Sequence, residues 1–220
     1  MLREEVTKML GTHWSLVSLM LVSASLIMTY FWYDKKDIST KEIALTATLA
    51  AFAGLSRVPF AAIPSFQPTT FLVLVSGYVF GAGSGLMVGS MAAFVSNFFL
   101  GHGPWTPWQM AAWGLVGVSG GILSRWRLRH AKIFLLILSF LWGLCFGWLL
   151  NIWHWLTFVY PLTLRSFIAI QLTSIWFDFI HALGNVLFMY FLGTDLIKIL
   201  HRFKRRLTVS RLPIQELERS

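Results

Sequence analysis

Three polar side chains recur along the last apolar segment of the sequence. Asp178, His181 and Asn185 are separated by three and four residues, which is the spacing that places side chains on one face of a helix. A carboxylate and an imidazole at this spacing can pair with each other. The pattern is typical either of a buried polar pair that holds helices together or of one wall of a ligand site.

Further polar side chains lie toward the ends of neighbouring apolar segments. Asn97 comes near the end of one segment, Gln109 begins the next, and Gln171 comes early in the last. Polar side chains are costly inside a membrane and normally face the interior of a helix bundle. We therefore expect these three residues to line one cavity together with Asp178 and His181.

The sequence offers little support for catalysis. Ser174 lies one turn from Asp178, but HExxH, GxSxG and P-loop motifs are missing from the sequence. The single cysteine, Cys145, sits in an apolar run, so neither an internal disulfide nor a cysteine-based metal site is expected. We expect no enzyme, no cofactor and no metal. A small membrane transferase or hydrolase that uses Asp178 and His181 is one alternative, and a stand-alone secondary transporter is another.

The composition shows which elements must position these side chains. Of the 220 residues, 56% are hydrophobic and 12% are charged, whereas a soluble domain carries about 25% charged residues. A membrane helix needs about 20 mostly apolar residues. The sequence therefore predicts an all-α membrane protein with seven apolar segments: Thr12–Tyr33, Ile43–Ala61, Thr69–Phe80, Gly85–Leu100, Trp108–Ser124, Ile133–Leu150 and Ser166–Gly193. The glycines of Gly81–Gly85 predict a tight turn between two of them.

The basic residues predict how the segments cross the membrane. The net charge of +9 comes from lysines and arginines that fall between apolar runs, which excludes a nucleic-acid-binding face. If the C-terminal end is cytoplasmic, fourteen of the eighteen basic residues lie inside and four outside, as the positive-inside rule requires. We expect the N-terminus outside. The expected divisions are a first helix with its linker (1–42), a six-helix core (43–197) and a basic cytoplasmic tail (198–220).

The loops expected on the outer side are rich in proline and tryptophan. Arg57–Thr70 contains three prolines, Gly101–Gln109 contains two tryptophans, and Asn151–Trp155 contains two more. Tryptophan favours the membrane interface in any case. Rigid aromatic loops above a helix bundle also suit a rim around a flat ligand.

Small residues form lines on two segments. Ala47 and Ala51 are four residues apart, and Gly85, Gly89 and Ala93 continue the same period on another segment. Small side chains allow helices to approach closely in lipid. The two lines either pack helices within this chain or form a smooth face on which another membrane subunit docks.

Taken in order, these features resemble a known family. Lys41–Trp126 resembles the substrate-binding S component of energy-coupling factor (ECF) vitamin transporters, through the Ala-x-x-x-Ala line, the Arg57–Thr70 loop, the glycine-rich Gly77–Gly85 stretch and the string from Ser96 to Met110. The Ser96–Met110 string resembles a subset associated with cobalamin uptake. The first helix departs from the six-helix pattern of that family, which puts its role in doubt.

The resemblance implies a six-helix vitamin-binding bundle, to which the apolar segments add an N-terminal transmembrane helix. Its partners would be a membrane scaffold subunit and two cytoplasmic ATPases, with ATP hydrolysed by the partners. It implies a substrate zone in the outer half that contains Gln67, Asn97, Trp105, Trp108, Gln109, Trp153, His154 and the upper part of the last helix. It assigns the scaffold contact to Ala47, Ala51, Gly85, Gly89 and Ala93. Tryptophan stacking and amide hydrogen bonds suit a corrin ring, but they suit a flavin, a pterin or a deazapurine equally.

Overall fold

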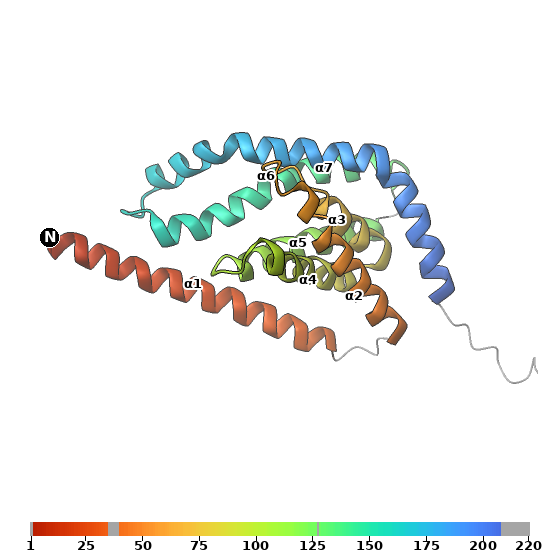
Figure 1. Cartoon of the computed structure of the whole chain (residues 1–220), viewed down its shortest axis with the longest axis horizontal. Coiled ribbons are helices and arrows are strands. Elements are labelled where there is room, and N and C mark those ends of the chain that lie inside the picture. The colour runs from red at the N-terminus through yellow and green to blue at the C-terminus, as the bar shows by residue number, and fades with distance from the viewer. Residues whose placement is uncertain (1, 35–39, 127, 208–220) are drawn as a thin grey trace, which may run out of the picture.

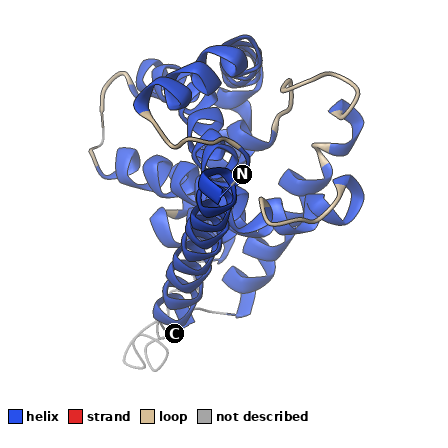
Figure 2. Ribbon diagram, turned by 90° about the vertical axis from the view of Figure 1, so that its left-hand side faces the viewer, coloured by secondary structure: helices blue, strands red, loops and turns tan. Residues whose placement is uncertain are grey.

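The computed structural model describes residues 2–34, 40–126 and 128–207, and these residues form helices and connecting loops without a strand (Figure 2). The elements in chain order are α1 (Leu2–Asp34), α2 (Thr40–Leu55), a short 3-10 helix η1 (Val58–Phe60), α3 (Thr69–Phe80), α4 (Ala82–Leu100), α5 (Thr106–Arg125), α6 (Ala131–Phe158) and α7 (Leu164–Leu207). The all-α prediction is confirmed, and each of the seven expected segments coincides with a helix. The expected turn between α3 and α4 is a single residue, Gly81, whose φ of 97° is in the region that favours glycine.

Four stretches of the described chain are long and apolar enough to cross a bilayer by themselves. They are Thr40–Phe60, Ala82–Leu100, Ala131–Phe158 and Leu164–Arg206, and Ser15–Phe31 and Thr69–Phe80 are shorter apolar helices. The α5 helix is not among them, although it has 20 residues. Because α5 packs against α1, α3, α4 and α6, protein surrounds much of it, and it has less need of lipid-compatible side chains.

Close backbone contacts join α3, α4 and α5 into the centre of the bundle. A methyl group on Gly89 of α4 would overlap the carbonyl oxygen of Trp113, and one on Gly117 of α5 would overlap that of Gly85. Gly77 of α3 faces Gly117 in the same way. These contacts require glycine, and they bring the helix axes near enough for buried side chains such as Val88 and Val116 to pack.

The α6 and α7 helices form a long antiparallel hairpin. Its seam on α6 consists of Ser139, Gly143 and Gly147, each four residues from the next, and Gly143 lies directly against Ala182 of α7. The 44 residues of α7 span about 66 Å, more than twice the roughly 30 Å of a hydrocarbon core. The small seam brings α6 and α7 close together around Gly143 and Gly147.

The C-terminal end of α7 turns back toward the bundle (Figure 1). The Nζ atom of Lys204 donates a 2.6 Å hydrogen bond to the carbonyl oxygen of Val79, near the end of α3, and Leu200 is buried. The first part of the expected basic tail is therefore a continuation of α7, while residues 208–220 lie outside the described residues.

The additional helix α1 packs against α5 and α6. Ser15 and Thr157 share a hydrogen bond of 3.0 Å between their hydroxyls, which joins α1 to the last turn of α6. The N-terminal end of α1 and the α6–α7 connection lie at one end of the molecule, and the C-terminal end of α7 lies at the other (Figure 1). Among the described residues, α1 does not pack extensively against α2.

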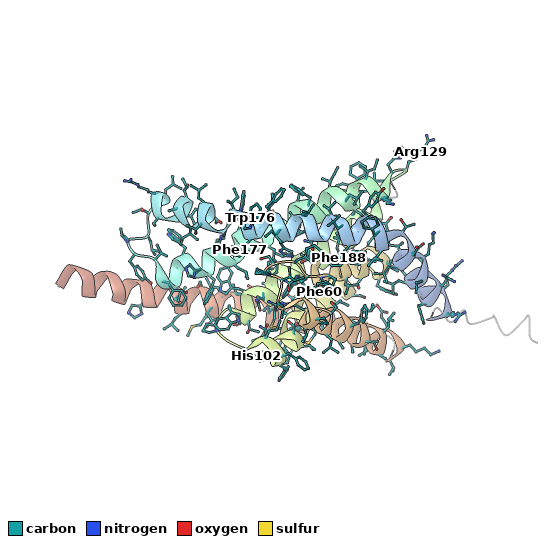
Figure 3. The ribbon with its side chains drawn as sticks, turned by 45° about the horizontal axis from the view of Figure 1, so that its top comes forward. Phe60, His102, Arg129, Trp176, Phe177 and Phe188 are labelled. Carbon is teal, nitrogen blue, oxygen red and sulfur yellow. The ribbon has the colours of Figure 1, made fainter. Side chains whose placement is uncertain are left out.

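Phenylalanines fasten the loop between α2 and α3 to α7. The ring of Phe188 lies 5.7 Å from that of Phe60 and 5.2 Å from that of Phe66, measured between centroids, and Figure 3 shows Phe60 beside Phe188. Gly184 makes room for Phe66, because a methyl group there would come within 2.9 Å of the ring. The loop is held at its middle and at its end.

The central glycine contact can be tested by enlarging it. We expect Gly89→Ala to destabilise the folded chain by about 1–3 kcal/mol, the usual cost of overpacking, because the new methyl group would overlap backbone that cannot move independently. Thermal unfolding in detergent would measure the loss. The control is Ala47→Leu on the exposed face of α2. An equal loss of stability in both variants would contradict the conclusion that the close helix contact requires glycine at position 89.

The fastening of the loop can be tested with two phenylalanines of α7. We expect Phe188→Ala to increase hydrogen–deuterium exchange in residues 58–67, because three of the ring contacts of Phe188 join α7 to Phe60, Phe66 and Phe71. Phe191→Ala is the matched control, since Phe191 is 69% exposed. Unchanged exchange in the Phe188 variant would show that the loop is held by other contacts.

Candidate functional site

A cavity of about 440 Å³ lies between the α2–α3 loop, α5, α6 and α7. The loop supplies Phe60, Ile63 and Gln67 to its wall, and the two helices of the hairpin supply both apolar and polar side chains. Two charged residues of opposite sign, Arg57 and Asp178, also line it. The cavity therefore combines features of a small-molecule site: a concave shape, apolar walls and a few convergent polar groups.

Arg57 is the centre of the polar network at the top of the cavity. Its Nε atom donates to Oε1 of Gln67 over 2.7 Å, and its Nη1 atom donates to Oγ of Ser96 and to Oδ1 of Asn97 over 3.1 and 3.2 Å. The guanidinium carbon lies 5.0 Å from the centroid of the Trp113 ring, in a cation–π contact. One arginine thus links the loop, α4 and α5.

Asn97 connects this network to α5 through two further hydrogen bonds. Its amide nitrogen donates to Oγ1 of Thr106 over 3.0 Å and to Oε1 of Gln109 over 2.8 Å. Asn97 does not line the cavity itself, whereas Gln109 does. Asn97 therefore orients Gln109 and Arg57.

His181 is held from the side of α3. The indole nitrogen of Trp113 donates to Oγ1 of Thr70 over 3.0 Å, and the same oxygen lies 2.9 Å from Nε2 of His181. The Phe146 ring meets the imidazole edge-on at 5.3 Å. His181 is 4% exposed and lines the cavity.

Asp178 is held by its own helix and by α6. The Ser174 hydroxyl donates to Oδ2 of Asp178 over 2.9 Å, and the amide nitrogen of Asn151 donates to Oγ of Ser174 and to Oε1 of Gln171, both over 2.7 Å. The Oδ1 atom of Asp178 lies where a methyl group on Gly147 would be. The expected face is confirmed in that Asp178, His181 and Asn185 are all buried. The expected pairing of Asp178 with His181 is wrong, because each has a different partner.

The structure separates the expected site residues into three groups. Gln67, Gln109, Asp178 and His181 line the cavity. Asn97 and Gln171 lie behind it and are hydrogen-bonded to residues that do line it. Trp105, Trp108, Trp153 and His154 do not line it. Trp105 packs against Trp153 with centroids 5.9 Å apart, and His154 is exposed on the last turns of α6.

Three of the cavity-lining residues that make side-chain hydrogen bonds were not among the site residues expected from the sequence. Arg57 was counted only as an outer basic residue, Asn151 was seen only as part of an aromatic loop, and Ser174 was considered only as a weak nucleophile. For Arg57 a signal was available, because a cation at the end of an apolar segment, followed by a proline-rich loop, needs buried partners. The partners of Asn151 and Ser174 depend on the hairpin register.

The line of small residues on α4 is not available to a partner subunit. Gly85 and Gly89 face the backbone of α5, and Ala93 is fully buried. Of the two possibilities, this line packs helices within the chain, which corrects the expected scaffold contact at these three residues. Ala47 is exposed on α2, and Ala51 is half-buried.

The site lacks the arrangement of a hydrolase or a metal centre. Ser174 donates to Asp178, and His181 is bonded to Thr70, so serine and histidine do not form a nucleophile–base pair. Among the described residues, no three histidine, cysteine or acidic side chains come together as metal ligands. The arrangement is suited to holding a ligand by hydrogen bonds.

Comparison with known proteins gives a family and a set of distant relatives. The family model "ECF transporter, substrate-specific component" matches residues 41–193, from α2 to most of α7. A UPF0397 protein of Vibrio atlanticus (strain LGP32) is 29% identical over 105 residues, 44% of this chain and 57% of the relative. A UPF0397 protein of Aliivibrio salmonicida (strain LFI1238) is 29% identical over 102 residues, 44% of this chain and 55% of the relative. The chain thus spans about half the length of these curated relatives.

No solved structure gives a significant match to the chain. The family model covers well over half of the residues, and of the described helices α1 and the end of α7 lie outside it. The apolar helices and this match establish a multi-pass membrane protein. The chain belongs to the family of substrate-specific components of ECF transporters.

Proposed function

We propose that this chain is the substrate-binding subunit of an ECF importer and that it captures a small vitamin-type molecule in the Arg57–Asp178 cavity. The observation that carries the proposal is that two side chains of opposite charge line one cavity without pairing with each other. Ionisable groups inside a membrane bundle mark substrate paths more often than structural contacts. The family match supports binding in preference to chemistry.

The volume of the cavity supports a ligand smaller than cobalamin. About 440 Å³ is near the lower end of the roughly 300–1,000 Å³ range of small-molecule sites. A corrin ring with its side chains and nucleotide tail would overfill such a space. The tryptophans expected to stack on a corrin also lie outside this wall. Among the ligands considered from the sequence, we therefore propose the flavin, pterin and deazapurine class in place of cobalamin.

We propose that the cavity opens to the outside and that the basic end of α7 is cytoplasmic. Arg129, Lys198 and the cluster from Arg202 to Arg206 belong to the set expected inside. In Figure 3, Arg129 lies near the end of the molecule to which α7 runs. The α2–α3 loop lies at the other end of α3 from the basic end of α7, and it covers the cavity there. A scavenged molecule would then meet the loop first.

We propose that α2 contacts the scaffold subunit, which acts with two cytoplasmic ATPases. Ala47 is exposed, and so are Ala44 and Thr48, which lie on the same face of α2 at helical spacing. Because α1 packs on α5 and α6, it leaves this face open. A narrow alanine surface permits the close helix approach that association in lipid requires.

Ligand retention tests the binding role. We expect native mass spectrometry of the detergent-purified chain, incubated with riboflavin, thiamin, pterin and cobalamin, to show one adduct from the smaller molecules. Arg57→Gln should reduce that adduct by about tenfold or more, because a charge-assisted donor is lost. Arg165→Gln, an exposed arginine at the start of α7, is the control. The role would be contradicted if no adduct formed, and the size argument would be contradicted by a cobalamin adduct.

Bulky residues on α2 test the partner surface. We expect the Ala47→Trp/Ala51→Trp variant to lose vitamin uptake when expressed with scaffold and ATPase subunits, while the isolated variant keeps its ligand adduct. Uptake of the labelled ligand and native mass spectrometry are measured in parallel. Loss of both would show that α2 supports the fold. Uptake by the chain without its partners, driven by an ion gradient, would point to a stand-alone transporter.

A further inference from the structure

The hydrogen-bond network leaves donors free on one side of the cavity and acceptors free on the other. On the side of the α2–α3 loop and α5, the guanidinium of Arg57 has five N–H groups. Three are used on Gln67, Ser96 and Asn97. The two on Nη2 have no acceptor among the described residues. This nitrogen is available to donate to a molecule in the cavity.

The two glutamines on the same side are oriented by this network. The Oε1 atom of Gln67 accepts from Arg57, and the Oε1 atom of Gln109 accepts from Asn97. The oxygen of each side chain is thus turned toward the network, and its amide nitrogen, which only donates, is left for the cavity that both residues line. With Arg57, this wall presents donors.

The wall formed by α6 and α7 presents acceptors. Both N–H groups of the Asn151 amide are used, on Gln171 and on Ser174, so its Oδ1 atom is left to accept. Ser174 donates to Oδ2 of Asp178, and Oδ1 of Asp178 has no donor among the described residues. Asp178 is 5% exposed, and both Asn151 and Asp178 line the cavity. Gly147 gives the carboxylate the room that it occupies.

We infer that the ligand is an uncharged fused heterocycle with a 2-amino-4-oxopyrimidine ring, of the pterin or deazapurine type. Its adjacent N–H and amino groups meet the carboxylate of Asp178 and the carbonyl of Asn151. Its carbonyl oxygen and ring nitrogen face Arg57, Gln67 and Gln109. One cation and one anion in the wall already balance, so a neutral ligand leaves no unpaired charge in the membrane interior. This inference rests on the proposed function and identifies its substrate class.

The same pattern disfavours a pyrimidinedione edge such as that of a flavin. A dione presents a carbonyl oxygen on each side of its single N–H group. Against Asp178 and Asn151, at least one of those oxygens would face another oxygen, and a buried acceptor without a donor is costly. Asp178 is therefore the residue that distinguishes a ligand with an amino group at this ring carbon from one with a carbonyl.

A matched pair of probes isolates that ring carbon. Pterin and lumazine share one bicyclic ring and differ in having an amino group or a carbonyl at position 2, with N1 unprotonated in pterin and protonated in lumazine. Both fluoresce, so binding to the purified chain in detergent can be titrated directly. We expect pterin to bind at least about tenfold more tightly than lumazine. In Asp178→Asn the preference should be lost or reversed, because an amide offers a donor to the second carbonyl.

Two further variants control for folding. Asp195→Asn changes an exposed carboxylate on the same helix, which pairs with Lys198 over 3.1 Å, and it should keep the preference for pterin. Ser174→Ala removes the donor that positions Asp178 and should reduce the preference in part. If Asp178→Asn fails to fold, the Ser174→Ala variant tests the role of Asp178 in its place. Thermal unfolding of every variant shows which of them fold.

The outcomes separate this inference from the function on which it rests. Equal binding of pterin and lumazine, or a preference unchanged in both Asp178→Asn and Ser174→Ala, overturns the substrate class. Binding of neither probe by a chain that retains riboflavin or thiamin also overturns the class and leaves the binding role standing. A chain that binds neither probe and retains no member of the vitamin panel overturns both.

Discussion

A guanidinium in the interior of an apolar bundle is the constraint on which the site depends. Arg57 is half-buried there, so the N–H groups that do not face the cavity require protein acceptors. Gln67, Ser96 and Asn97 supply them from the loop and from α4, and Trp113 of α5 lies beneath the cation. The arginine thereby fixes the loop over the cavity and sets the direction of each amide around it.

Close packing of α3, α4 and α5 makes that network possible. Gly85 and Gly117 allow the backbones of α4 and α5 to touch, and Asn97 therefore reaches both Thr106 and Gln109. Wider helix spacing would leave these amides unpaired in a medium that penalises unpaired polar groups. The small residues of α4 are thus used inside the chain, and the outward face of α2 remains for a partner.

The α6–α7 hairpin supplies the opposite charge under similar constraints. Gly143 and Gly147 let α7 approach closely enough for Asn151 to bond Ser174, and Ser174 in turn holds Asp178. The result is a cavity whose two walls differ in hydrogen-bonding sense while their charges balance. Recognition by such a site depends on the pattern of donors and acceptors on a ligand as well as on its size.

The sequence by itself determined the helices, the Gly81 turn and the shared face of Asp178, His181 and Asn185, because hydropathy and helical period are local properties. The polar pattern and the family resemblance also predicted Gln67, Gln109, Asp178 and His181 as site residues, and all four line the cavity. Only the tertiary structure decided that Arg57 is central and that Asp178 bonds Ser174 instead of His181. It also decided that the expected tryptophans and His154 lie off the cavity wall. Those outcomes depend on helix spacing and register, which arise from contacts between residues such as Gly147 and Asp178 that are distant in the chain.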